Sequence, residues 1–488
     1  MADPERKTGP RQRDLTSGAI GRTLLLFAIP TLGSSVLQSL NGSINAIWVG
    51  RFLGEEALAA TSNGNIVMFM LIAFVFGFGM AATILVGQAF GRGDVDAARK
   101  TVGTALGSFV GVSAVIAGIG WLLAPELLQL LGTPGPAMPL ALAYLRVIFI
   151  AVPGMLTMTL LMMSLRGSGD SLTPLWFMGL SVVLDSSLNP VFILGLGPAP
   201  RLGIAGSATA TAVATYVSLA AMLVYTYRRD LPLRLRGSEL RYLKPDTALL
   251  STMVRKGLPM GLQMIVITSS ALAILSLVNR QGVITTAAYG VTQQLWTYVQ
   301  MPAMALGAAV SAMAAQNIGA GRWDRVSHIT RSGVIYNVAM TGTLVLVLTI
   351  VDRPALELFL GQDSPALPVA RHIQLVATWG FIAFGVSLVL FGTIRANGQV
   401  IWPLLILFIS MYPVRLGFVS ATDQWLGADA LWLSFPVGMV STMLMAIVLY
   451  RGGGWKRSSI APQAIDQDEC VELARADAEP GGAFQPTG

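Results

Sequence analysis

The sequence SLRGSGDSLTP at residues 164–174 occurs a second time, in altered form, as TIRANGQVIWP at residues 393–403. Three pairs of residues occupy equivalent places, 229 positions apart: Arg166 and Arg395, Gly169 and Gly398, and Pro174 and Pro403. Internal similarity at a fixed spacing is typical of a duplicated architecture. This stretch therefore predicts that the chain consists of two related halves.

Two further motif pairs hold nearly the same spacing in the same order. Pro30 in FAIPTLG corresponds to Pro259 in KGLPMGL, 229 positions later. GQAFGRGDVDAAR corresponds to AQNIGAGRWDRV, 228 positions later, and the matched pairs there are Gln88 and Gln316, Gly91 and Gly319, Gly93 and Gly321, and Asp96 and Asp324. Three separated motifs at one spacing make a chance match a poor explanation.

Composition places both halves in a membrane. Hydrophobic residues make up 54% of the 488 residues, charged residues only 12%, and the mean hydropathy is +0.66. Soluble domains carry about 25% charged residues. Apolar runs of about 20 residues, enough to cross a hydrocarbon layer of ~30 Å as helices, recur along the chain. Lipid offers the backbone no hydrogen-bond partners, and the alternating pattern of a β-barrel is absent, so we expect an all-α polytopic membrane protein.

Twelve apolar stretches are predicted to cross the membrane, six in each half. They are 23–50, 57–88, 96–122, 137–163, 172–197, 204–227, 248–279, 285–315, 328–350, 367–394, 400–420 and 427–450. Six is even, so both halves start from the same side and share one orientation. This is the parallel-repeat arrangement, which suits alternating access by two rigid lobes.

Lys and Arg gather in alternate connections. These are Arg6, Lys7, Arg11, Arg13, Arg92, Arg99, Lys100, Arg228, Arg229, Arg234, Arg236, Arg241, Lys244, Arg322, Arg325, Arg451, Lys456 and Arg457. Basic connections stay inside, which predicts an inner or plasma membrane protein with both termini cytoplasmic. The expected segments are a cytoplasmic N-terminal segment 1–22, a first lobe 23–228, a cytoplasmic linker 229–246, a second lobe 247–450 and a disordered cytoplasmic tail 451–488.

Several classes of site are excluded by the residues. Cys470 is the single cysteine and there are two histidines, so neither a disulfide within the chain nor a His/Cys metal site is expected. We expect no cleaved signal peptide. The glycines after Gln88 and Gln316 predict tight turns, since no phosphate-binding motif GxxxxGK[ST] is present. The net charge of +7 is assigned to cytoplasmic loops and not to nucleic-acid binding.

The motifs together resemble the multidrug and toxic compound extrusion (MATE) family of secondary transporters, and the first half resembles its DinF-like members. The matching stretches are NAIWVGRFLGEEALAA (45–60), GQAFGRGDVDAAR (87–99), YLRV (144–147), RGSGDSLTP (166–174), LNPVFILGLG (188–197), LGIAGSATAT (202–211) and AQNIGAGRWDRV (315–326). The resemblance implies twelve transmembrane helices in two six-helix lobes with a V-shaped fold. It also implies export of organic cations or other drug-like compounds in exchange for H⁺ or Na⁺.

Asp185 is the one acid predicted to lie deep in a span, within SVVLDSSLNP (181–190). Ionisable groups inside a membrane are rare and usually functional. Asn189 lies four residues further on, on the same helix face, and Pro190 cannot donate its backbone hydrogen bond. A buried carboxyl favours its protonated form, and a nearby cation favours the ionised form. Asp185 is therefore predicted to exchange a proton or Na⁺.

The family pattern differs here in two ways. Many members carry Asn-xxx-Asp-Pro on the fifth helix, whereas this chain has Asp185-xxx-Asn189-Pro190, and Asn45 replaces a second acid in the first helix. The resemblance places Tyr144 beside the same pocket. The predicted coupling residues are therefore Asp185, Asn189, Asn45 and Tyr144. The alternative is that Asp185 only holds helices together.

Flexible thioethers and amides at membrane depth are candidates for substrate binding. They are Met162, Met178, Gln263, Met264 and Gln293, with core packing and bridging of helices as alternatives. No deep acid is predicted in the second half, so we expect coupling in the first. Arg146 and Arg415 could each pair with an acid or bind an anion; the alternative, which is favoured for Arg415 near the outer end of its span, is that they reach the headgroup layer. Gly103, Gly107 and Gly111 predict close helix packing.

We therefore expect a secondary active multidrug efflux transporter for cationic or amphipathic organic compounds. The alternative is a flippase for lipid-linked precursors, which typically has a strongly basic central cavity; few Lys or Arg fall at mid-membrane here. A membrane enzyme is disfavoured because no Ser/His, metal or carboxylate-pair constellation is present. We expect a monomer in contact with membrane lipid that needs no cofactor besides its coupling ion.

Overall fold

The structure is a computed structural model that describes residues 14–130, 132–133, 135–197 and 199–457. The side chains of residues 55, 56, 58–60, 62–67, 69, 70 and 74 are not described. Cys470, the first 13 residues of the predicted N-terminal segment and residues 458–488 of the predicted tail lie outside the described residues. Every secondary-structure element in the described ranges is helical.

The first lobe contains six long helices and one short one. They are α1 (Ile20–Leu53), α2 (Glu55–Arg92), α3 (Val95–Leu122), the short α4 (Ala124–Leu130), α5 (Met138–Gly167), α6 (Leu172–Leu194) and α7 (Ile204–Arg228). A 3₁₀ turn, η1 (Gly135–Ala137), precedes α5. Tight turns connect the long helices, as predicted at Gly93, which has φ 78° and ends α2.

The second lobe repeats this order with more interruptions. It contains α8 (Thr247–Asn279), α9 (Val283–Gly319), α10 (Trp323–Ile350), the short α11 (Asp352–Leu360), α12 (Ala366–Ala377), α13 (Gly380–Ala396), α14 (Ile401–Ile409), the π-helical turn η3 (Ser410–Val414), α15 (Arg415–Leu426), α16 (Ala428–Gly452) and the 3₁₀ turn η4 (Gly454–Arg457). Gly321, with φ 71°, makes the turn that Gly93 makes in the first lobe.

The tenth predicted span, 367–394, is not one straight helix. It is broken into α12 and α13, which are bent by 45° relative to each other. Gly380 opens α13, and a Cβ there would lie 2.9 Å from the Cα of Pro436, so the bend brings its backbone onto α16. Among the described residues eleven helices are long and apolar enough to cross a membrane, or twelve if this bent pair is one span. The predicted fold class is confirmed.

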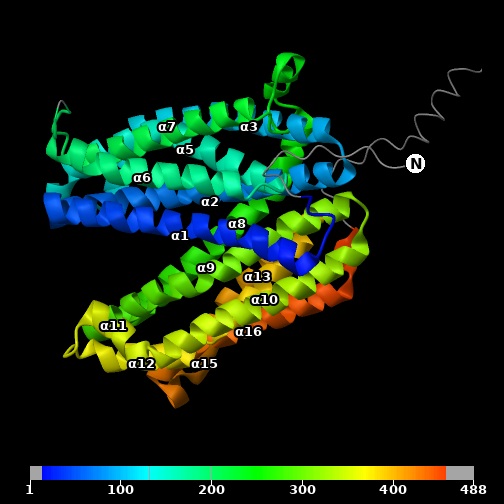
Figure 1. Cartoon of the computed structure of the whole chain (residues 1–488). Helices are drawn as coiled ribbons and strands as arrows, with labels where there is room; N and C mark the ends of the chain where they lie inside the picture. Colours follow the sequence, from blue (N-terminus) through cyan, green and yellow to red (C-terminus); the bar gives the residue numbers. More distant parts are fainter. Residues whose placement is uncertain (1–13, 131, 134, 198, 458–488) are drawn as a thin grey trace, which may run out of the picture.

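The two lobes form a V (Figure 1). They meet at the end of the bundle that carries the linker between α7 and α8, called the linker end below, and diverge toward the end that carries α11 and α12. Most of the contact between the lobes is made by α1 and α2 of the first lobe against α8, α9 and α10 of the second. Buried side chains of the two lobes pack together there, as Leu24 and Phe27 of α1 do with Leu306 of α9, so the lobes share an extensive apolar interface.

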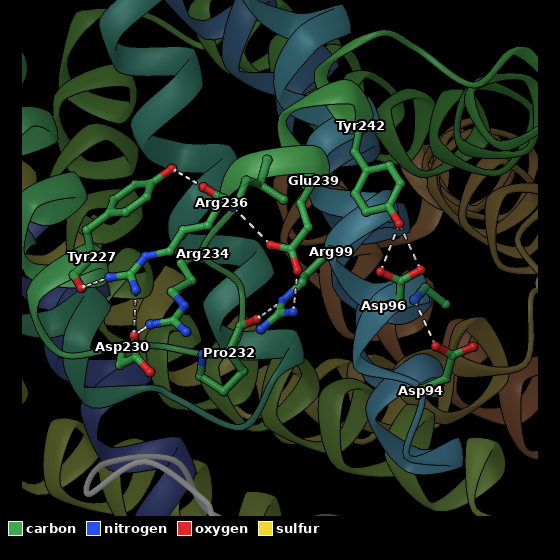
Figure 2. A network of polar contacts seen from close by, with 12 residues as sticks. Asp94, Asp96, Arg99, Tyr227, Asp230, Pro232, Arg234, Arg236, Glu239 and Tyr242 are labelled. Atoms are coloured by element: carbon green, nitrogen blue, oxygen red, sulfur yellow. Dashed lines mark hydrogen bonds and ion pairs between the residues drawn. The ribbon is translucent and has the colours of Figure 1, made fainter.

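The linker is fixed to α3 (Figure 2). Arg99 binds Glu239 at 2.6 Å and donates from Nε to the Pro232 carbonyl at 2.8 Å. Tyr242, in the 3₁₀ helix η2 (Gly237–Leu243), donates to Asp96 at 2.8 Å. The predicted close packing of α3 glycines is present at Gly103 and Gly107, but the partner is this linker and not another membrane helix, because a Cβ on either would meet the backbone of η2.

Candidate functional site

Asp185 lies inside the first lobe, on α6, with 1% of its surface exposed. α6 is apolar over most of its length, and its sequence neighbours supply no charge. No Lys or Arg of the described residues forms an ion pair with it. Burying an unpaired carboxylate is unfavourable by several kcal/mol, so the surrounding polar groups decide whether this charge can exist.

Four neutral donors surround the carboxylate. Oδ2 accepts from Asn41 Nδ2 at 2.8 Å and from Asn45 Nδ2 at 2.9 Å. Oδ1 accepts from Asn189 Nδ2 and from Thr211 Oγ1, both at 3.1 Å. The donors therefore come from three helices, α1, α6 and α7.

Helical spacing explains how α1 and α6 supply these groups. Asn41 and Asn45 are four residues apart, so both face α6 from one side of α1. Asp185 and Asn189 have the same spacing, and Asn189 also donates to Asn45 Oδ1 at 2.8 Å. The amides thus bind each other as well as the carboxylate, which fixes their orientation.

Two amide oxygens at the site are left over. Asn41 Oδ1 and Asn189 Oδ1 are buried and accept no hydrogen bond from the described residues. Together with the carboxylate they are hard oxygen atoms of the kind that bind alkali and alkaline-earth cations. No group of three or more His, Cys, Asp or Glu side chains that could hold a metal ion occurs among the described residues. The carboxylate and the two amide oxygens are groups that can hold a cation or, at the carboxylate, a proton.

Tyr144, on α5, is 9% exposed. The predicted coupling residues Asp185, Asn189 and Asn45 are thus in direct contact, whereas no hydrogen bond of the described residues joins Tyr144 to them.

Two residues of the network were not predicted, Asn41 and Thr211. Asn41 lies within the first predicted span, 23–50. Its spacing of four from Asn45 is the signal that could have identified it. Thr211 lies in a run of small residues, and nothing in that run distinguishes it from Thr209.

The predicted substrate-binding residues lie in different places. Met162 is 5% exposed and packs in a cluster that also holds Leu231 and Leu233 of the linker, so it lies toward the linker end. Met178 packs against the same cluster. Met264 is half-buried on α8.

The two predicted glutamines differ in exposure. Gln263 is buried and bridges helices, since its Oε1 accepts from Arg395 Nη1 and its Nε2 donates to the Val400 carbonyl, both at 3.3 Å. Gln293 is exposed on α9. These residues do not gather around Asp185.

The expectation for Arg415 is wrong. Its side chain does not reach toward a headgroup layer but is buried, 5% exposed, with its guanidinium over the ring of Phe435 at 3.7 Å. The reason is the π-helical turn η3, which shifts the helix register just before Arg415 and directs it against α16. Arg146 is half-buried and lies over Trp121 at 4.7 Å.

The fold and the site define a duplicated helical membrane protein with a buried carboxylate in its first lobe. The family model MatE matches residues 30–191 and 259–419, one segment in each lobe. The chain is 36% identical over 444 residues to "Probable multidrug resistance protein YoeA" of Bacillus subtilis (strain 168), covering 91% of this chain and 96% of that protein. It is 30% identical over 443 residues to "Probable multidrug resistance protein YpnP" of the same organism, covering 91% and 97%.

The fold also matches solved structures. One, described as "Outward-facing conformation of a multidrug resistance MATE family transporter of the MOP superfamily", has a TM-score of 0.84 and 19% identity and covers 93% of this chain and 100% of that chain. The chain belongs to the MATE family. It is accordingly a multi-pass membrane transporter and not an enzyme.

Proposed function

We propose that the protein is a secondary active multidrug exporter that couples export to H⁺ or Na⁺ at Asp185. The observation that carries this proposal is a carboxylate buried to 1% exposure and bound by four neutral donors without a cationic partner. The names of the relatives YoeA and YpnP support the drug-export part. The coupling part rests on the chemistry of the site.

Neutral donors stabilise the carboxylate without cancelling its charge. A hydrogen bond from an amide or hydroxyl favours the ionised form, but a net charge remains in an apolar lobe. Either a proton on the carboxyl or a Na⁺ bound by Asp185 and the amide oxygens of Asn41 and Asn189 would neutralise it. Release of that ion on one side of the membrane and uptake on the other couples the site to an ion gradient.

The duplicated fold supplies the movement for this exchange. Two lobes that meet at the linker end and diverge at the opposite end can alternate between opening at one end and opening at the other. We propose that the substrate binds between the lobes and that the occupancy of Asp185 selects the open side. We propose cationic or amphipathic organic compounds as the exported class, which is what the resemblance to the family implies.

We further propose a monomer in the inner or plasma membrane, with the linker end in the cytoplasm. The basic linker and the basic turns after α2 and α9 support this orientation. No cofactor besides the coupling ion is needed for the exchange described.

The decisive variant is Asp185→Asn, which keeps the size of the side chain and removes its charge. We expect ion-driven transport of ethidium in proteoliposomes to fall by at least about tenfold, and resistance of expressing cells to be lost. Imposing a pH gradient and a Na⁺ gradient separately identifies the coupling ion.

Asp423→Asn is the matched control, since Asp423 is exposed near the far end of α15. Normal transport by Asp185→Asn, with unchanged response to both gradients, would leave Asp185 with a structural role only. Equal losses in both variants would point to a general effect of removing charge.

A further inference from the structure

Arg415 is a buried cation with neither an ion-pair partner nor a hydrogen-bond acceptor for its Nε and Nη2 among the described residues. Both of these nitrogen atoms are buried. Phe435 covers one face of the guanidinium, and the edge formed by Nε and Nη2 has no hydrogen-bond acceptor among the described residues. An unpaired charge in such a place is unfavourable unless a ligand uses it.

The unused edge has the geometry that binds a carboxylate. Nε and Nη2 point in the same direction, and two parallel hydrogen bonds from such an edge hold a carboxylate in its plane. The same protein uses this edge elsewhere. Arg371 donates from Nε to Asp352 Oδ2 at 2.7 Å and from Nη2 to Asp352 Oδ1 at 3.4 Å.

Arg415 occupies in the second lobe the place that Asp185 occupies in the first. α14 begins at Ile401, 229 positions after Leu172 begins α6, which is the spacing of the repeat. A π-helical turn contains one more residue than an α-helical turn. The turn η3 therefore raises the spacing to 230, and Arg415 becomes the equivalent of Asp185.

The neighbouring helices agree with this equivalence. α7 and α16 each contain 25 residues, and each follows a glycine of similar backbone conformation, Gly203 with φ 57° and Gly427 with φ 54°. Those glycines are 224 positions apart. At that spacing Thr211, which donates to Asp185, corresponds to Phe435, which lies over Arg415.

The first helices of the two lobes complete the comparison. Aligned on Pro30 and Pro259, the amides that bind Asp185 correspond to residues that bind no cation. Asn45 corresponds to Ile274, which is fully buried. Asn41 corresponds to Ser270, whose hydroxyl donates to the Met411 carbonyl in η3 at 3.2 Å. The charge of the site is reversed and its cation ligands are absent.

We propose that Arg415 binds a carboxylate group of the transported compound through Nε and Nη2. The exported class then includes amphipathic compounds that carry a carboxylate as well as a cationic group. This inference rests on the proposed function, because it assumes a transported organic compound. It adds a second-lobe site for an anion to the first-lobe site for a cation.

The test compares norfloxacin, which carries a carboxylate and a protonated amine, with its methyl ester, which keeps the amine alone. Binding to the purified full-length protein is measured by calorimetry. We expect the wild type to bind norfloxacin at least about tenfold more tightly than the ester, as a charge-assisted bidentate pair requires. Arg415→Gln should abolish this difference and change ester binding less than about twofold. Arg415→Lys keeps the positive charge but cannot form two parallel hydrogen bonds, so it should keep part of the difference in affinity between acid and ester.

Other results overturn the proposal. Equal wild-type affinity for acid and ester, or a difference that survives Arg415→Gln, removes the carboxylate site. Thermal stabilisation by acetate that depends on Arg415, without any acid–ester difference, assigns the site to a free anion instead. If Arg415→Gln does not give a monodisperse protein, Arg415→Lys is measured in its place. A difference in affinity between acid and ester that is as large in Arg415→Lys as in the wild type contradicts the bidentate contact.

The failure of this inference is distinct from that of the proposed function. If the protein binds the acid more tightly than the ester but shows no ion-driven transport, the proposed export function is wrong and the carboxylate site at Arg415 stands. If the wild type transports ethidium in response to an ion gradient but binds acid and ester equally, only the carboxylate site at Arg415 is wrong.

Discussion

Asp185 depends on amides supplied by another helix. Asn41 and Asn45 both donate to its Oδ2, and no described basic residue is available to replace them. Losing either donor leaves the carboxylate with fewer contacts in an apolar lobe, which favours protonation. The donors are distributed over α1, α6 and α7, so an ion bound at Asp185, as proposed, would act on three helices at once.

Asn41→Ala tests a residue that the sequence did not single out. Removal of one hydrogen bond to a charged group costs about 1.5–3 kcal/mol. We therefore expect ion-driven ethidium transport to fall roughly tenfold, less than in Asp185→Asn, with Asn45→Ala giving a similar loss. Ser43→Ala is the control on the same helix, because its hydroxyl donates only to the Ser39 carbonyl. Equal transport by Asn41→Ala and Ser43→Ala would exclude Asn41 from the site.

At the scale of elements, side-chain contacts fix the linker to both lobes. Besides the contacts of Arg99 and Tyr242, Lys100 Nζ on α3 binds Asp246 Oδ2 at 2.6 Å. Asp246 also caps α8, since its Oδ1 accepts from the Leu249 amide at 3.0 Å. One side chain therefore joins the first lobe to the start of the second.

The Asp246 contacts give a pH-dependent contribution to stability. The hydrogen bond from Lys100 and that from the Leu249 amide lower the pKa of Asp246. A carboxyl whose pKa is lowered by folding stabilises the fold above its usual pKa of about 3.9, and this stabilisation is lost as the pH falls through the lowered value. The ion pair between Lys100 and Asp246 is partly exposed, so it contributes about 0.5 kcal/mol to the free energy of unfolding.

Asp246→Asn and Asp246→Ala separate the two roles. Asn keeps the cap and loses the ion pair, so we expect the free energy of unfolding to fall by about 0.5 kcal/mol at neutral pH. Ala also loses the cap, at a cost of about 1 kcal/mol more. Thermal unfolding followed at neutral pH and near pH 3 should show the gap between wild type and Asp246→Asn closing in acid. A gap that does not depend on pH would exclude the ion pair as its cause.

At the scale of the whole molecule, the lobes are joined at the linker end by a contact with twofold pseudosymmetry. Gln88 Nε2 on α2 donates to the Ala396 carbonyl at 2.8 Å, and Gln316 Nε2 on α9 donates to the Gly167 carbonyl at 2.9 Å. Each glutamine thus reaches the end of a helix in the other lobe. Glycines keep the helices this close, since a Cβ on Gly91 would meet the Gln316 carbonyl, and one on Gly319 would meet the Gln88 carbonyl.

A reversible crosslink tests whether this interface must open. A Cβ built on Gly87 lies 3.0 Å from that of Ala315, shorter than the separation of about 3.5–4.5 Å in disulfides, so a small outward shift of the two backbones would allow the bond. In a Cys470→Ser background, Gly87→Cys with Ala315→Cys should form a disulfide that stops ion-driven transport, and reduction should restore it. Each single cysteine variant is the control for the substitution itself. Undiminished transport by the oxidised double variant would show that the linker end stays closed during the cycle.

Much of this architecture follows from local physics that one sequence displays. Apolar runs of membrane-spanning length must be helical because lipid satisfies no backbone group. The predicted spans overlap the observed helices, although some ends differ by about one turn and the tenth span is broken into α12 and α13. The duplication was visible because repeated turns require glycine, as at Gly93 and Gly321. Asp185 was identifiable because a carboxyl in such a run is exceptional.

The partners of these side chains were decided by tertiary structure. Asn41 and Asp185 are 144 residues apart, and which face of α1 meets α6 depends on how the helices pack, which no local pattern encodes. The same holds for Arg415. A one-residue π-helical insertion sets its register and places it opposite Phe435 in a buried site, where the sequence alone suggested a residue at the membrane surface. Sequence determined which segments enter the membrane, because transfer to lipid depends on composition; packing determined which charges face which groups, because that depends on contacts between distant helices.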